Sequence, residues 1–292
     1  MIANRRSLSG SLYPIAVAAI IAFSLPCVAH AQANQMFRDM NKPVAPFHMI
    51  GNIYYVGASD ITSYLVVTPS GDIVLDGGFA ETAPQIEANI RTLGYKLSDV
   101  KIILNSHEHL DHAGGIAELK RLTGAQFVAM AEEVPTLTSG ADFPAVTPDR
   151  IIHDGDTVEL GGVTLTAHLT PGHTRGCTTW TMVTTDAGKP YNVVFVGSAS
   201  ELPNYKLIDR PGSPATYPGI EADYEKMFRV LKSLPCDVFL GAHGSFYSMV
   251  QKREAMLKNP PQNPFIDPAG YQAYIAHAEA VFQAELQRER AG

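Results

Sequence analysis

The stretch ILNSHEHLDHAGG, residues 103–115, decides the fold of this chain. It places four potential metal ligands within six positions, namely His107, His109, Asp111 and His112. Imidazole nitrogens and carboxylate oxygens are donors that suit zinc and similar divalent ions. The apolar residues before the cluster predict a buried strand, and those after Gly115 recur at helical spacing. We therefore expect a metal site on a strand-to-helix loop, where functional sites of open α/β sheets commonly lie.

The spacing within the cluster indicates how many ions it serves. His107 and His109 are two positions apart, so on an extended loop they point the same way and can share one ion. Asp111 and His112 are adjacent, so they diverge from that pair and can serve a second ion nearby. A surface loop that is merely rich in histidine is the alternative. The regular alternation of ligating and non-ligating positions favours metal binding over that alternative.

The motif His107-x-His109-x-Asp111-His112, followed by two glycines, resembles the signature of the metallo-β-lactamase superfamily. The resemblance implies an α/β fold, a four-layer αββα sandwich in which helices flank two mixed β-sheets. It also implies a hydrolytic site with one or two metal ions. Two further histidines, each at the end of a strand, are needed to complete that site.

Two downstream histidines fit these positions. His173 lies in the turn TPGHT at residues 170–174, and His243 ends the apolar run of residues 238–242. An ordinary turn histidine and a buried core histidine are the respective alternatives. The resemblance implies two Zn²⁺ per chain, one bound by His107, His109 and His173 and the other by Asp111, His112 and His243.

Two other polar residues lie near the expected ligands. Asp76 stands at a strand end before two glycines and resembles the superfamily aspartate that supports the site from outside the ligand set. His168 alternates with Leu165, Ala167 and Leu169 in a predicted strand, so we expect it on the polar face and not as a ligand.

The composition and the first residues of the chain indicate its domain organisation. Its 292 residues are 46% hydrophobic, enough for one large domain, and the net charge of −7 argues against nucleic acid as a partner. A basic start, an apolar run at residues 15–25 and the small-x-small signal at residues 29–31 predict a secretory signal peptide at residues 1–31. The remaining residues 32–292 then form a single periplasmic or secreted domain without a membrane span, assumed monomeric. Cys177 and Cys236 either pair there or are separate small buried residues.

Hydrophobic patterns and turn residues predict the order of the elements. Strands are expected at residues 52–56, 62–67, 73–76, 100–104, 125–130, 163–169, 193–196 and 237–244. Helices are expected at residues 84–94, 116–122, 224–234 and 267–290, with a loop near the site at residues 139–148.

Ser198 follows the predicted strand Val193–Val196 and separates the branches of the superfamily. Thioesterases of the glyoxalase II type have an aspartate here that bridges both metals. Serine leaves the site with about one more positive charge, which favours an anionic substrate. The chain therefore resembles subclass B3 of the metallo-β-lactamases. The resemblance implies that Ser198 and Ser200 bind the carboxylate of a β-lactam and that Tyr205 helps to polarise its carbonyl group.

The function we expect is zinc-dependent hydrolysis of the β-lactam amide bond, which confers antibiotic resistance. In this hypothesis a metal-bound hydroxide attacks the carbonyl carbon, and Asp111 orients that hydroxide. Another secreted zinc hydrolase, a lactonase or thioesterase, would share every ligand and remains an alternative. A non-catalytic zinc protein is a further alternative. Six ligands over two ions leave coordination positions open, which favours catalysis over a structural site.

Overall fold

The computed structural model describes Met1 and residues 35–258 and 260–291. The chain divides into two units, Met1–Arg38 and Asp39–Gly292, and the elements below belong to the second unit. Apart from Met1, the predicted signal peptide at residues 1–31 lies outside the described residues. In the part of the chain that is described, no helix combines the length and the apolar character needed to cross a bilayer.

The first sheet has seven strands in sequential order. Strands β1 to β4 pair antiparallel, whereas β4 to β7 are parallel. The carboxyl ends of these parallel strands therefore meet at one edge of the sheet. The strands are β1 (Phe47–Ile50), β2 (Ile53–Tyr55), β3 (Tyr64–Thr68), β4 (Gly71–Leu75), β5 (Val100–Leu104), β6 (Gln126–Met130) and β7 (Arg150–Ile152).

The second sheet has five strands in the order β12-β11-β10-β9-β8. Only β11 and β12 are parallel neighbours, so both sheets are mixed, as expected. The strands are β8 (Thr157–Leu160), β9 (Val163–Leu169), β10 (Thr178–Asp186), β11 (Lys189–Val196) and β12 (Val238–Gly241).

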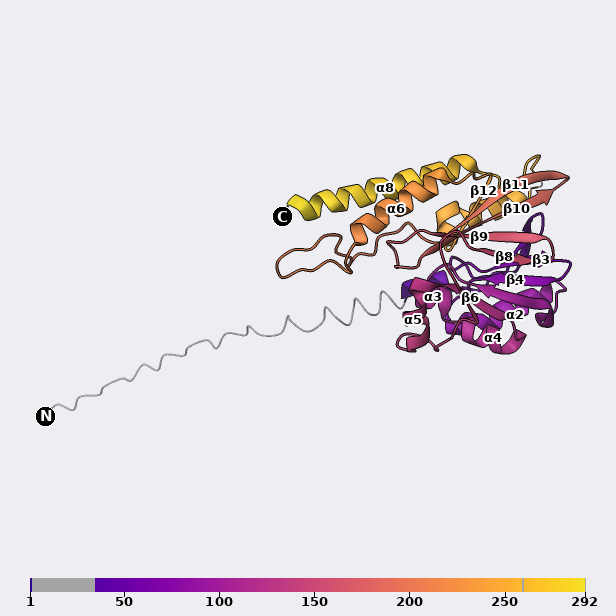
Figure 1. Ribbon diagram of the computed structural model, residues 1–292, viewed down its shortest axis with the longest axis horizontal. Coiled ribbons are helices and arrows are strands. Elements are labelled where there is room, and N and C mark those ends of the chain that lie inside the picture. Colours follow the sequence, from indigo (N-terminus) through magenta and orange to yellow (C-terminus); the bar gives the residue numbers. More distant parts are fainter. Residues whose placement is uncertain (2–34, 259, 292) are drawn as a thin grey trace. The chain divides into compact units, whose positions relative to one another are not determined.

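Helices flank the two sheets on opposite sides, which completes the predicted four-layer αββα sandwich (Figure 1). Helices α2 and α4 pack apolar residues such as Ile90 and Leu119 against one face of the first sheet. Helices α6 and α8 pack residues such as Met227 and Phe282 into the core that also fills the space between the sheets. The helices are α2 (Ala83–Thr92), α3 (Leu110–Ala113), α4 (Ile116–Thr123), α5 (Val134–Ser139), α6 (Ile220–Ser233), α7 (Met249–Met256) and α8 (Pro268–Ala291).

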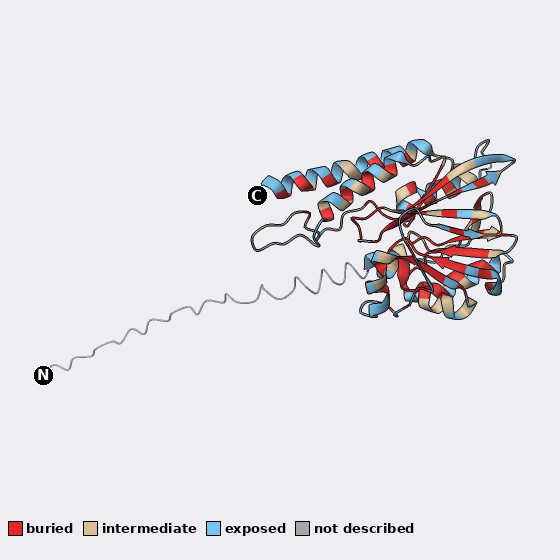
Figure 2. Cartoon of the chain, in the orientation of Figure 1, coloured by how far each residue is buried: buried red, intermediate tan, exposed pale blue. Residues whose placement is uncertain are grey.

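Burial follows these layers (Figure 2). The strands are largely buried, while the outer helices expose one side. In α8 the side chains of Tyr271, Ile275 and Phe282 are buried, and Tyr274 and Ala278 pack partly against the same core. One side of this helix therefore covers the second sheet.

Three details differ from the sequence-based expectations. The ligand loop is not extended throughout, because Leu110–Ala113 form the short helix α3 directly after His109. Helix α6 ends at Ser233 and not at Leu234, whose backbone is extended. The proline that follows Leu234 disfavours a helical conformation there. Strands β1, β7, β8 and β10 and helices α5 and α7 were not expected.

The two cysteines do not form a disulfide. Cys177 and Cys236 are both free thiols, the first buried and the second half-buried. Of the two alternatives drawn from the sequence, separate packing of the two side chains therefore holds.

The two sheets are joined by hydrogen bonds at the edge where the ligand loop leaves β5. The amide of Thr178, at the start of β10, donates to the carbonyl oxygen of Ser106 at 2.7 Å. The buried indole of Trp180 donates to the carbonyl oxygen of Asn105 at 3.0 Å. On the other side of the loop, a Cβ atom at Gly115 would lie 2.2 Å from the carbonyl oxygen of Gly77. Only glycine permits this close approach, so the second glycine of the motif lets the loop pack against the end of β4.

Candidate metal centre

The first group of ligand candidates contains His107, His109 and His173. One nitrogen from each ring lies within 4.8 Å of the others. His109 Nδ1 and His173 Nε2 are 3.0 Å apart. His107 and His173 are buried and His109 is half-buried. The structure therefore brings together the three histidines that the resemblance assigns to one ion.

The second group contains Asp111, His112 and His243. His112 Nε2 and His243 Nε2 are 3.2 Å apart. Asp111 Oδ2 lies 3.5 Å from His112 Nε2 and 3.7 Å from His243 Nε2. Although Asp111 and His112 belong to the helical turn α3, their ligand atoms converge on His243, which follows β12 in the second sheet.

Buried hydrogen bonds determine which ring nitrogen each histidine presents. His173 Nδ1 donates to the carbonyl oxygen of Ser200 at 2.8 Å, which leaves Nε2 as an acceptor. His112 Nδ1 lies 3.2 Å from Asp76 Oδ2, and His243 Nδ1 lies 3.1 Å from Asp60 Oδ2. Since carboxylates accept these bonds from Nδ1, Nε2 is the atom that each ring presents to a metal.

Asp76 organises the interior side of the site, as the resemblance implied. It follows β4, is 1% exposed and has a positive φ of 66°. Its carboxylate accepts hydrogen bonds from the Ser106 amide at 2.6 Å and the Ser106 hydroxyl at 2.7 Å, as well as from His112. Because the Ser106 hydroxyl gives its proton to Asp76, it accepts from His107 Nδ1 at 3.0 Å. Asp76 thereby orients His112 directly and His107 through Ser106.

Asp60 was not identified from the sequence. It lies in the loop between β2 and β3, and its Oδ1 accepts a hydrogen bond from the Ser245 amide at 2.7 Å. Its carbonyl oxygen accepts another from Gly244 at 2.7 Å. These bonds hold the segment after β12 and place Asp60 Oδ2 against His243. A single aspartate 183 positions away from its histidine has no spacing pattern that could reveal it.

The electrostatic environment of the first group suits neutral imidazoles. Burial, followed by the neighbouring imidazoles, lowers the pKa of His107 well below its usual value. Burial lowers the pKa of His173 in the same way, and it lowers the pKa of His109 to about 4. Metal ligation requires neutral histidine, so these three side chains are ready to bind an ion at neutral pH.

The second group carries a charge pair. Burial opposes ionisation of Asp111, but His112 and the other imidazoles outweigh it and hold the pKa of the carboxyl group far below its usual value. Burial lowers the pKa of His112, yet Asp111 and Asp76 overcome this effect and raise it to about 10. A metal ion in this group therefore has to displace the proton of His112.

The donor atoms fit a pair of divalent ions. His107 Nε2 is buried and has no hydrogen-bond partner among the described residues. A buried polar atom without a partner is unfavourable unless something else satisfies it. Five imidazole nitrogens and one carboxylate, divided into two groups of three, form a donor set suited to a dinuclear centre of the zinc type.

The three residues predicted to contact substrate lie beside the first group. Ser198 is buried, and its Oγ accepts a hydrogen bond from the Ser200 amide at 3.2 Å. The Tyr205 hydroxyl donates to the carbonyl oxygen of His173 at 2.6 Å. This bond links Tyr205 to the backbone of His173, and the role of Tyr205 in polarising the substrate stays a prediction.

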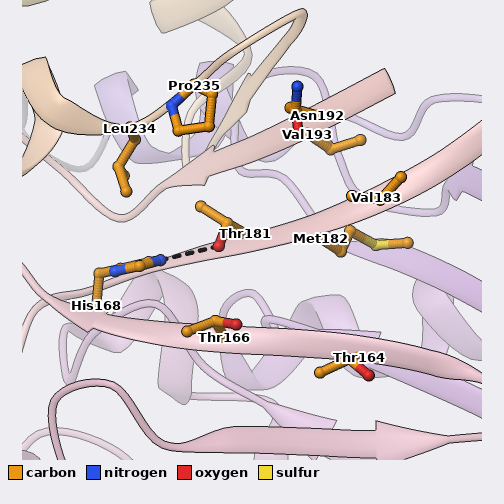
Figure 3. Close-up of a pocket in the computed structure, with 10 residues that line it drawn as sticks. All are labelled: Thr164, Thr166, His168, Thr181, Met182, Val183, Asn192, Val193, Leu234 and Pro235. Atoms are coloured by element: carbon orange, nitrogen blue, oxygen red, sulfur yellow. Dashed lines mark hydrogen bonds between the residues drawn. The ribbon is translucent and has the colours of Figure 1, made fainter. Parts of the chain in front are cut away.

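His168 lies apart from both groups, as expected. Its Nε2 is 2.8 Å from the hydroxyl oxygen of Thr181, in a hollow of about 340 Å³ (Figure 3). Residues of β9, β10 and β11, together with Leu234 and Pro235, line this hollow, and none of the six ligand candidates does. The hollow is therefore separate from the candidate metal centre.

Comparison with known proteins agrees with this geometry. The family model of the metallo-β-lactamase superfamily matches residues 56–243. The FEZ-1 metallo-β-lactamase from Legionella gormanii is 44% identical, covers 87% of this chain and 99% of its own, and superposes with a TM-score of 0.82. BJP-1, a subclass B3 metallo-β-lactamase of Bradyrhizobium japonicum, is 39% identical over 86% of this chain and 97% of its own, with a TM-score of 0.80.

Curated relatives match a shorter part of the chain. A hydroxyacylglutathione hydrolase of Rhodopseudomonas palustris is 42% identical over 94 residues, which is 32% of this chain and 32% of that protein. The chain thus spans about a third of the length of this relative. The family match and the long alignments with solved structures lead to the same conclusion. The chain belongs to the metallo-β-lactamase superfamily and resembles its subclass B3 members.

Proposed function

We propose that this protein hydrolyses the amide bond of β-lactams with two zinc ions, one in each group of ligands. The observation that carries the proposal is Ser198, which follows β11 beside the centre where thioesterases of the superfamily have a bridging aspartate. Among the described residues, Asp111 is the only carboxylate in either group of ligands. The centre then retains the positive charge that attracts the carboxylate of a β-lactam. The near full-length similarity to metallo-β-lactamases supports the same choice.

Three residues of the chain have separate roles in the proposed reaction. Zinc ions, when bound, lower the pKa of water and polarise the lactam carbonyl group. Asp111, which its neighbours hold ionised, accepts a hydrogen bond from the attacking water and keeps that water oriented toward the carbonyl carbon. Ser198 accepts from the Ser200 amide and still has its own proton to donate to the substrate carboxylate. Tyr205 keeps His173 in place from the loop after β11.

The test is hydrolysis of a carbapenem and a penicillin by the purified protein, followed by the loss of lactam absorbance. We expect turnover with zinc, loss of turnover after chelation and recovery when zinc is returned. A susceptible bacterium that expresses the protein should also become resistant to these antibiotics. A folded protein that binds two zinc ions and leaves both lactams intact would contradict the proposal.

Thioester hydrolysis is the second candidate, because one hydroxyacylglutathione hydrolase shares 42% identity with the chain over 94 residues. A glutathione thioester and an acyl lactone belong in the same assay as the lactams. Turnover of the thioester with a higher kcat/KM than either lactam would favour this candidate over the first.

A further inference from the structure

A buried carboxyl group that the reaction does not use lies behind the first group of ligands. Glu133 ends the 3-10 turn Ala131–Glu133 that follows β6, and it is 1% exposed. Strand β6 is the parallel neighbour of β5, so Glu133 leaves the sheet at the same edge as His107. The topology of the sheet thus brings Glu133 to the rim of the metal centre.

The contacts of Glu133 come from two different loops. Its Oε1 accepts a hydrogen bond from the Thr174 hydroxyl at 2.7 Å. Burial, followed by the neighbouring Glu108 carboxyl group, raises the pKa of Glu133, and the Thr174 hydroxyl and the amides of Gly176 and Glu108 act to lower it. A Cβ atom at Gly176 would lie 2.5 Å from Glu133 Cγ, so this loop closes tightly over the side chain.

These contacts reach both segments that supply the first group. Glu108 stands between His107 and His109, and Thr174 directly follows His173. Burying a carboxyl group costs free energy that an apolar side chain of similar size would not cost at the same position. Its Oε2 in fact has no hydrogen-bond partner in the described part of the chain. The acceptor at Oε1 therefore requires an explanation other than packing.

We propose that Glu133 is a positioning residue that holds the His107–His109 segment and the His173 segment at the separation which one metal ion requires. It thereby sets the metal affinity of the first group and not of the second. The inference depends on the proposed function only in taking the first group as a metal site.

Zinc affinity, measured by competition with a chromophoric chelator, tests this inference. The variant is Glu133→Leu, which keeps the volume and removes the acceptor, and the matched control is Glu132→Leu at the exposed neighbouring position. Each is combined with His243→Ala, which disables the second group, and separately with His173→Ala, which disables the first. We expect Glu133→Leu to weaken zinc binding by roughly 10–100-fold in the His243→Ala protein, as outer-shell changes do. Little change is expected in the His173→Ala protein or for Glu132→Leu.

A double-mutant cycle with Thr174→Val examines the hydrogen bond itself. Thr174→Val should weaken the first group alone, and the double variant with Glu133→Leu should lose less than the sum of the two single losses. If Glu133→Leu does not fold, Thr174→Val and Glu133→Gln, which keeps an oxygen acceptor and should retain most of the affinity, provide the test.

The outcomes that overturn the inference differ from those that concern the proposed function. Unchanged zinc affinity of Glu133→Leu, or an equal loss in both backgrounds, shows that Glu133 has no specific role in positioning the first group. Failure of the unaltered protein to bind zinc or to hydrolyse lactams bears on the proposed function. Loss in the first group alone supports positioning, because a general defect in folding would weaken both groups.

Discussion

Replacement of Asp111 by alanine is expected to lower kcat/KM for a carbapenem by roughly 10²-fold or more, the loss that a misplaced reacting group causes. Asp111 supplies the one carboxylate among the six ligand candidates of the described chain. Its removal takes away both a ligand of the second group and the group that orients the attacking water. Steady-state kinetics with excess zinc measure the effect.

Metal content separates the two roles of Asp111. The Asp111→Ala protein should bind one zinc ion where the unaltered protein binds two, because the three histidines of the first group remain. Glu118→Ala is the matched control, since this exposed carboxylate pairs with Arg121 on α4 and does not belong to either group. An Asp111→Ala protein with undiminished turnover would rule out the proposed mechanism.

Asp76→Ala is expected to reduce both the stability of the fold and the metal affinity of the second group. It leaves the charged His112 ring and the two Ser106 donors buried without their acceptor, and such losses of a buried charge partner amount to about 3–5 kcal/mol. Alanine also tolerates the positive φ at this position poorly. Denaturant unfolding of the metal-free protein measures the loss of stability.

Asp76→Asn is the informative companion variant. Asparagine tolerates a positive φ and still accepts a hydrogen bond from the Ser106 amide, so its loss of stability should be smaller. Its amide group, however, would donate to His112 Nδ1, and the neutral ring would then carry its proton on Nε2, the atom that faces His243 and that a metal needs. We expect zinc affinity of the second group to fall by roughly 10–100-fold. An Asp76→Asn protein with normal affinity would show that the aspartate does not control the His112 tautomer.

The sequence predicted β2 to β6 of the first sheet, the residues that the structure brings together in the two groups, and helices α2, α4, α6 and α8, because each has a local signature. His107, His109, Asp111 and His112 lie within one motif, and His173 and His243 each follow a strand-like run. The agreement extends to Asp76, whose strand end is also visible in the sequence. These features depend on neighbours in the chain, which is why spacing reveals them.

Features that depend on contacts between distant segments could not be predicted in this way. Asp60 contacts His243 and Glu133 contacts Thr174, each far away in the sequence, and neither acidic residue has a motif. The Tyr205 hydroxyl donates a hydrogen bond to the carbonyl oxygen of His173 in another loop, and the identity of the side chain alone does not predict this contact. Helix α3 was not predicted either, because a four-residue helix has too few residues to show periodicity.

Each group of ligands draws members from both sheets. His107, His109, Asp111 and His112 leave the first sheet after β5, whereas His173 and His243 belong to segments of the second. A segment of the chain that ends before residue 170 therefore contains four of the six donors and neither complete group. Ion binding and the docking of the sheets must consequently favour one another by equal free energies. At a free-ion concentration one hundred times Kd, each occupied group would add about 2.7 kcal/mol to the stability of the docked state. The free-metal concentration around the protein thus helps to set the free energy that keeps the two sheets docked.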